Sequence, residues 1–396
     1  MAYNHGVRVL ENPTSLTTPR QGTAGLQVII GVAPVNLAED PYNATNRPKI
    51  AYSFAEASAA VGYCDNFKDY NICESVDASF RVLNIAPIIL INVLDPKTHK
   101  KALEEQEVEV IEGQAVIETF GVLADTLRVR SGDREMAADT DYIITFDDDG
   151  MAVITLVDAT GINALTVSGS VIDPSKITYR DIIGGYNVST GEEKGLEVIR
   201  QIFPLLQLTP GLLVSPGWSK QPNVGAAIAA KCTGINGVFS CEAIVDLDTT
   251  EESGARKYTD VLTVKQASGF VSNHLSVEWP CVKIGDKIYH ASAIKAALTA
   301  YIDAGNDDVP SLSPSNKAVG ISGLCLEDGT EVVLDEQQAN LVNSFGVCTF
   351  NNFSGWTTWG NNTAIYPTSS DPKDRWFCCR RFFSWWGNSF ILTYHE

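Results

Sequence analysis

The sequence lacks the short motifs with which many enzymes hold a phosphate, a metal ion or a nucleophile. The patterns G-x-x-x-x-G-K-[ST], G-x-G-x-x-G, H-E-x-x-H and G-x-S-x-G are all absent. None of the five histidines lies at metal-ligand spacing from another histidine or from a suitable cysteine. We therefore predict no metal site and no cofactor. An enzyme whose active site leaves no local motif stays an open alternative.

Two segments match part of an active-site motif without completing it. Ser292 and Lys295 have the S-x-x-K spacing of penicillin-binding enzymes, but no Lys-Thr-Gly segment follows. Asp147, Asp148 and Asp149 are adjacent, whereas a calcium loop needs acids at alternate positions and a distal glutamate. We interpret the first pair as ordinary helix residues and the acids as a hairpin tip, and we predict no catalytic residue.

Long hydrophobic runs are also missing. The most apolar segment, residues 82–94, contains Asn84, Pro87 and Asn92 and is shorter than the ~20 residues that cross a bilayer. We interpret it as a buried strand. The first residues show no basic stretch followed by an apolar one, so we expect no secretory signal and no membrane partner.

Basic residues are few. Lys and Arg number 29 against 48 Asp and Glu, which gives a formal net charge of −19. Such a surface repels the phosphates of nucleic acid, so we expect no nucleic-acid partner. The nine cysteines form no C-x-x-C pair, and we interpret them as reduced and mostly buried thiols.

What is present is an α/β pattern with an interruption. Residues 26–34 and 86–94 have the composition of buried strands, and Ser53 followed by Glu56 predicts a helix start. Between residues 97 and 180 short alternating segments and many acids indicate a small all-β unit. We predict an α+β fold in which an α/β-type core, with a mixed sheet and flanking helices, carries an inserted all-β domain. The predicted segments are an N-terminal arm (1–22), a first core part (23–96), the insertion (97–181), a second core part (182–369) and a C-terminal helix and strand arm (370–396).

Both ends of the chain contain strand-like runs that could add to the sheet of a neighbouring subunit. The alternative is that the two runs pair with each other within one subunit. Between them, the helix predicted from residue 370 carries a basic stripe, which favours an acidic partner or else is a solvated helix face. The strand residues are His5, Val7, Val9, Ser389, Ile391 and Thr393, and the stripe consists of Lys373, Arg380 and Arg381.

Several segments resemble the contractile tail sheath family of phages and related injection systems. They match in order and spacing over nearly the whole chain, apart from residues 97–180. At Asn362 the family more often has arginine. The matching segments are Tyr3-Asn-His-Gly-Val-Arg-Val-Leu, Gly25 to Pro34, Leu208-Thr-Pro-Gly-Leu-Leu-Val-Ser-Pro-Gly, Ala243-Ile-Val-Asp-Leu, Tyr289-His-Ala-Ser-Ala-Ile, Pro310-Ser-Leu-Ser-Pro-Ser-Asn-Lys, Ala339-Asn-Leu-Val-Asn, Trp359-Gly-Asn-Asn-Thr, and Asp374-Arg-Trp with Arg380-Arg-Phe-Phe.

The resemblance implies a structural subunit without enzymatic activity. Such subunits stack as hexameric rings around an inner tail tube, exchange terminal strands with neighbours, and contract when the baseplate releases them; a tail terminator protein is a further implied partner. The implied location is the host cytoplasm during assembly and then the virion tail or a released contractile particle. The resemblance also implies that the tail helix, with its basic stripe, faces the tube. The runner-up interpretation is a surface-adhesion or capsid-associated module built on the β insertion, followed by an α/β enzyme.

Overall fold

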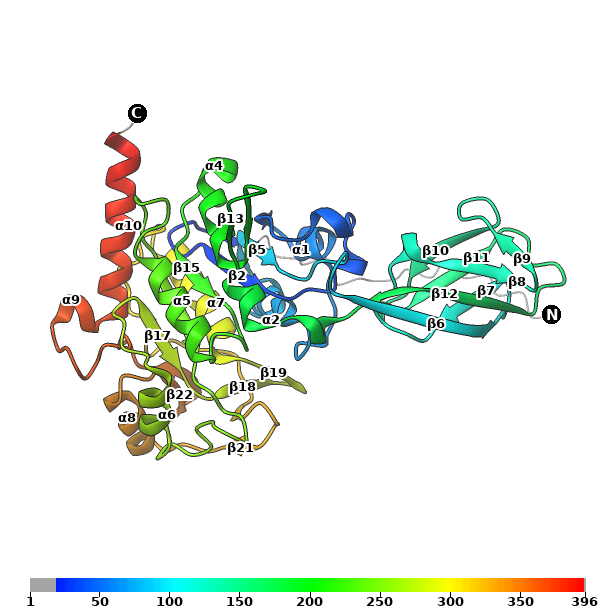
Figure 1. Ribbon diagram of the computed structural model, residues 1–396. Coiled ribbons are helices and arrows are strands. Elements are labelled where there is room, and N and C mark those ends of the chain that lie inside the picture. Colours follow the sequence, from blue (N-terminus) through cyan, green and yellow to red (C-terminus); the bar gives the residue numbers. More distant parts are fainter. Residues whose placement is uncertain (1–18, 395–396) are drawn as a thin grey trace, which may run out of the picture.

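The computed structural model describes residues 19–394. The predicted arm strand with His5, Val7 and Val9 therefore lies outside the described residues. A six-stranded sheet forms the centre of the larger body, with strand order β17-β16-β15-β2-β5-β3 (Figure 1). Its first five strands are parallel, and β3 runs antiparallel to β5. The strands are β2 (Gln27–Gly31), β3 (Lys49–Ala51), β5 (Ile88–Asn92), β15 (Leu212–Val214), β16 (Glu242–Asp246) and β17 (Leu275–Glu278).

Helices cover both faces of this sheet, which explains why its strands are continuous apolar runs in the sequence. Along β2, Val28 packs into one hydrophobic cluster and Ile29 into the other. Helix α5 contributes Ile228 to the first cluster, and α1 contributes Val61 to the second. The helices are α1 (Phe54–Val61), α2 (Asn71–Asp77), α3 (Tyr179–Ile183), α4 (Ile202–Leu206), α5 (Pro222–Cys232), α6 (Val261–Ser268), α7 (Ala291–Ala304), α8 (Glu336–Ser344), α9 (Pro372–Arg375) and α10 (Phe377–Tyr394).

Helix α1 shows how local sequence sets an element's ends. The Ser53 side chain accepts a hydrogen bond from the Glu56 N–H, and the Glu56 carboxylate accepts one from the Tyr52 N–H. The helix ends at Gly62, whose φ is +82° and where an added Cβ would lie 2.0 Å from the Pro34 oxygen. The helix start predicted at Ser53 is confirmed.

A second body of strands extends away from the core and is joined to it through β6 and β12 (Figure 1). It consists of two antiparallel sheets, of order β10-β11-β7 and β6-β12-β8-β9, around a hydrophobic cluster of their own. Because these strands share no sheet with the core, we propose that residues 97–181 form an inserted unit. The strands are β6 (Lys100–Glu109), β7 (Gln114–Ile117), β8 (Arg128–Ser131), β9 (Arg134–Met136), β10 (Tyr142–Phe146), β11 (Ala152–Leu156) and β12 (Ala164–Ile172).

Smaller sheets complete the core, and the mixture of helices and several sheets confirms the predicted α+β class. A four-stranded sheet has the order β19-β18-β20-β21, and three further pairs are β1-β4, β13-β14 and β22-β23. Their bounds are β1 (Arg20–Gln21), β4 (Ile85–Ala86), β13 (Gly185–Asn187), β14 (Glu192–Lys194), β18 (Cys281–Ile284), β19 (Lys287–Tyr289), β20 (Gly323–Cys325), β21 (Glu331–Val332), β22 (Thr349–Asn352) and β23 (Trp356–Trp359).

The predicted C-terminal strand is wrong. Ser389, Ile391 and Thr393 all belong to α10, which continues to Tyr394. Gly387, which precedes these residues, lies inside α10, where a glycine costs about 1 kcal/mol relative to alanine. The Ser389 hydroxyl donates to the Trp385 carbonyl one turn earlier, at 2.9 Å, as in a continuing helix. The alternating pattern that begins at Ser389 thus did not produce a strand, because the helix that begins at Phe377 continues through it.

Candidate assembly surface

The C-terminal helix α10 has two contrasting sides. It lies along the edge of the core opposite the second body of strands, and its last turns rise beyond the neighbouring elements (Figure 1). One side faces β16 and α7 through polar and charged groups, and the other carries exposed apolar side chains.

The seat of α10 consists of Arg381, Ser384 and Asn388, three residues on one side of the helix. The Arg381 guanidinium forms an ion pair with Asp303 of α7, and their side chains are 2% and 0% exposed. The Ser384 hydroxyl donates to Glu242 Oε1 at 2.8 Å. The Asn388 side chain donates to the Ser240 carbonyl at 2.7 Å and accepts from its N–H at 3.0 Å. These contacts fix the rotation of α10 about its axis.

The predicted basic stripe is therefore wrong as a single outward face. Arg381 is buried, and Arg380 is half-buried with Nη2 3.0 Å from His274 Nε2 and Nε 3.9 Å from Glu242 Oε1. Lys373 is exposed but belongs to α9, and the chain between α9 and α10 is extended at Trp376 (φ −90°, ψ 118°). The helical spacing assumed for these residues does not persist across that break. Buried Glu242 and Asp303 also need cationic partners, which draws the two arginines inward.

The outer side of α10 carries large apolar side chains. Phe383, Trp386 and Phe390 are 43%, 59% and 59% exposed, and Leu392 is 37% exposed. The first three are spaced by three and four residues, so they lie on one face of the helix. We call Phe383, Trp386 and Phe390 the outer face of α10; Leu392 follows Asn388 by four residues and lies on the opposite side of the helix. Clustered exposed aromatics are typical of protein interfaces, where they bury large areas at low entropic cost.

The first described residues are anchored beside the same helix, α7. The Asp308 carboxylate accepts hydrogen bonds from the N–H and hydroxyl of Thr23 and from the Ala24 N–H, at 2.8–2.9 Å. The Arg20 guanidinium lies 4.1 Å from the centre of the Tyr301 ring and donates to the Tyr301 carbonyl. Since Asp303 anchors α10, both ends of the described chain are attached around the C-terminal end of α7.

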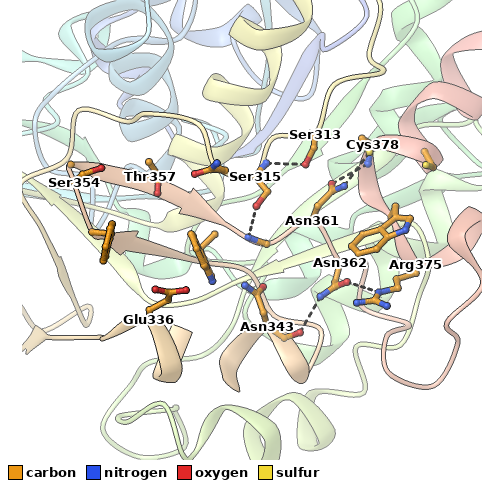
Figure 2. A pocket seen from close by; sticks show the side chains of 17 residues that line it. Ser313, Ser315, Glu336, Asn343, Ser354, Thr357, Asn361, Asn362, Arg375 and Cys378 are labelled. Carbon is orange, nitrogen blue, oxygen red and sulfur yellow. Dashed lines mark hydrogen bonds between the residues drawn. The ribbon is translucent and has the colours of Figure 1, made fainter. Parts of the chain in front are cut away.

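A cleft of about 840 Å³ lies where the β22–β23 hairpin meets the start of α10 (Figure 2). Asn362 bridges two of its walls: its amide donates to the Asn343 carbonyl and accepts from Arg375 Nε, both at 3.0 Å. Asn361 makes similar contacts with Cys378, accepting from its N–H at 3.2 Å. A guanidinium is thus supplied to this site by Arg375, although Asn362 stands where the resemblance leads one to expect arginine.

Ser292 and Lys295 both lie in the interior. The Ser292 hydroxyl donates to Asp246 at 2.6 Å, and Lys295 Nζ lies 3.9 Å from Glu278 Oε2. Both residues are 0% exposed, which agrees with a structural role. Among residues 19–394 no group of three or more His, Cys, Asp or Glu side chains is placed to hold a metal ion. Within the same range, no helix has the length and apolar character needed to cross a membrane.

A chain of alternating charges ties four segments of the core together. The His290 ring nitrogens lie 2.9 Å from Glu74 Oε1 and 2.8 Å from Glu327 Oε1, and Lys220 pairs with Glu327. Burial opposes ionisation of Glu327, but the hydrogen bond and charge of His290, together with Lys220, lower its pKa to about 2. The flanking carboxylates raise the pKa of His290 well above its ordinary value although burial opposes this.

We expect these ion pairs to make the free energy of unfolding depend on pH in the acidic range. The pKa of Glu327 is lower in the folded chain than its ordinary 4.5, so its contribution is complete above about pH 4.5 and is lost as the pH falls toward 2. His290 is protonated in both states in that window. Glu327→Gln should therefore flatten the fall in unfolding free energy between about pH 5 and pH 3, measured by urea titration. Exposed Glu331→Gln is the control, and equal slopes in wild type and Glu327→Gln would contradict the assignment.

Comparison with known proteins points to one family. No protein-family model matches the chain. The tail sheath protein of Burkholderia phage BcepMu is 24% identical over 382 residues, which cover 92% of this chain and 76% of the relative. A putative prophage major tail sheath protein of Pseudomonas aeruginosa UCBPP-PA14 is 32% identical over 203 residues, or 48% of this chain and 47% of the relative.

The chain is similar to tail sheath proteins over nearly its whole length. The resemblance seen in the sequence motifs is thereby confirmed. A chain in the cryo-EM structure of the anti-feeding prophage baseplate has a similar fold, with a TM-score of 0.53 over 99% of this chain and 76% of that one. At 13% identity this likeness concerns the fold alone.

The outer face of α10 was not predicted from the sequence. The spacing of Phe383, Trp386 and Phe390 was present in the sequence, but so was the spacing of Arg381, Ser384 and Asn388. Both sets have helical periodicity, and an amphipathic helix usually buries its apolar side against the core. Here the polar set is inside because Asp303 and Glu242 are already buried beneath it.

Proposed function

We propose that this chain is a structural subunit that polymerises as stacked hexameric rings around an inner tail tube. Contraction of the polymer would drive the tube through a target envelope, with the baseplate and a tail terminator protein as further partners. Assembly would take place in the host cytoplasm, and the product would be a virion tail or a released contractile particle. The observation that carries the proposal is the relationship to tail sheath proteins along 92% of the chain.

The anchoring of the chain ends supports a role for residues 1–18 as a linking arm. Asp308 and Tyr301 fix residues 20–24 to the C-terminal end of α7, so the first described residues have a defined place on the subunit. A strand there, with Val7 and Val9 on one side, could add to a neighbour's sheet through backbone hydrogen bonds. The rigid attachment would transmit a pull on the arm directly to α7.

The outer face of α10 supports the proposed contact with the inner tube. Its aromatic side chains are exposed while the polar side of the helix is occupied within the subunit. We propose an apolar contact made by Phe383, Trp386 and Phe390 in place of the expected contact by Arg380 and Arg381. Lys373 on α9 stays a proposed contributor, because its side chain is exposed.

Removing residues 1–18 should prevent polymerisation and leave the fold intact. The described anchor at Arg20 and Thr23 would be retained, so the thermal unfolding midpoint should match that of the full chain. Negative-stain electron microscopy with the inner tube protein should show striated hollow cylinders for the full chain and discrete particles for the truncation. Cylinders from the truncated chain would refute the linking arm, and discrete particles from both chains would refute the sheath function itself.

A further inference from the structure

The cleft at the start of α10 holds an arginine whose position is fixed by its neighbours. Arg375 is the last residue of α9, and its side chain lines the cleft. Its Cζ lies 4.0 Å from the centre of the Tyr366 ring and 4.2 Å from that of the Trp376 ring. Its Nε donates to Asn362 Oδ1 at 3.0 Å (Figure 2). Two aromatic rings and one amide therefore hold the guanidinium in one orientation.

The two terminal nitrogens of Arg375 have no partner of their own. Among residues 19–394 neither Nη1 nor Nη2 makes a hydrogen bond, and no carboxylate lies within ion-pair distance. Glu336 lines the same cleft, but it comes from α8 and lies at the far end from Arg375 (Figure 2). A guanidinium that is held through Nε and keeps both Nη groups free is arranged to bind a carboxylate through two hydrogen bonds.

Other groups in the cleft suit the same kind of ligand. The Ser313 hydroxyl accepts from the Ser315 N–H at 3.2 Å, and the Ser315 hydroxyl accepts from the Gly360 N–H at 2.9 Å (Figure 2). Each hydroxyl proton stays available for a further acceptor. Trp359 and Phe353 also line the cleft, and Phe353 is 83% exposed. Hydrogen-bond donors beside aromatic surface fit an acidic segment of a protein.

Carboxylates without partners gather at the far end of the second body of strands. Glu107 and Glu109 on β6 and Glu112 in the β6–β7 turn are exposed, and within residues 19–394 none has an ion-pair partner. We call these three residues the acidic edge. Two hydrogen bonds between Ile111 and Gln114, at 2.8 and 3.0 Å, close the turn that carries Glu112. The acidic edge therefore has a defined shape.

The cleft and the acidic edge lie at opposite ends of the molecule. Strand β22 and α10 are on the side of the core away from the second body, and β6 runs outward from the core to the acidic edge (Figure 1). A subunit cannot place its own acidic edge in its own cleft. A carboxylate from this surface can reach the cleft only when it belongs to another copy of the chain.

We propose that the cleft binds the acidic edge of a second copy of this chain, with Arg375 of one subunit paired to glutamates of the next. The chain has 48 acidic and 29 basic residues, so two copies repel each other unless cations of one meet carboxylates of the other. Because the two surfaces differ, the contact is heterologous and repeats from subunit to subunit. The inference rests on the proposed sheath function and names one contact of that polymer.

The test is co-sedimentation of the full-length chain with the inner tube protein over a range of subunit concentrations. Arg375→Gln should raise the concentration needed for half-maximal sedimentation about tenfold, because the glutamates lose their cationic partner. Glu107→Gln, Glu109→Gln and Glu112→Gln combined should cause a similar rise. Adding Arg375→Gln to these three should have no further effect, because both changes remove the same contact.

The control is Arg134→Gln, which removes an exposed guanidinium that is already paired with Asp141 in its own subunit and should assemble like the wild type. Wild-type assembly of Arg375→Gln, or additive losses in the combined variant, would overturn the contact while the sheath function stands. A wild-type chain that never sediments with the tube would overturn the sheath function and this contact with it. If Arg375→Gln unfolds, the glutamate variant decides: its normal assembly would refute the proposal.

Discussion

Replacing Arg381 with alanine should lower the free energy of unfolding by about 3–5 kcal/mol, the largest loss of stability that we expect from one substitution in α10. The reason is the carboxylate left behind. Asp303 is 0% exposed, and its second oxygen, Oδ1, has no hydrogen-bond partner among the described residues. Without the guanidinium a buried negative charge would lose its counter-charge and its hydrogen-bond donor.

Urea unfolding of the purified chain measures this effect, and two further variants assign it to the ion pair. Lys373→Ala removes an exposed positive charge nearby and should change stability by less than about 0.5 kcal/mol. Arg381→Met combined with Asp303→Leu replaces the pair by apolar groups and should recover much of the loss. A single Arg381→Ala variant as stable as wild type would show that the pair contributes nothing to the attachment of α10.

Replacing Trp386 with aspartate should abolish assembly on the inner tube while leaving the fold intact. Trp386 is 59% exposed, so its loss should alter the unfolding free energy of the subunit by less than about 0.5 kcal/mol. In the proposed interface the change removes a large apolar group and buries a charge. Aromatic interface residues commonly contribute about 2 kcal/mol or more, and the loss would recur at every subunit of the polymer.

Co-sedimentation with the tube protein and negative-stain microscopy measure this prediction. Val188→Asp is the matched control, because Val188 is 84% exposed and belongs to the segment between β13 and β14. The control should form striated cylinders like the wild type. Normal cylinders from Trp386→Asp would exclude the outer face of α10 from the tube contact, and failure of both variants would indicate a general intolerance of surface charge.

Much of the core could be predicted from short stretches of sequence. The apolar runs of β2 and β5 and the Ser53 cap of α1 were recognised, because burial on both faces and helix capping each involve only neighbouring residues. The likeness to tail sheath proteins was recognised from the order of short motifs along the chain. The end of α10 was not predicted, since residues 389–395 alternate like a strand and the helical contacts that prevail begin further upstream.

By itself the sequence determined the class of the fold, the start of α1 and the likeness to tail sheath proteins, all of which depend on local pattern and on the order of segments. The tertiary structure alone decided which side of α10 is buried and where the first described residues are anchored. Arg381 meets Asp303 78 residues earlier in the chain, and Thr23 meets Asp308 285 residues later. Such contacts have no short-range signature, because a buried carboxylate and its partner are brought together only when the sheet and α7 have packed.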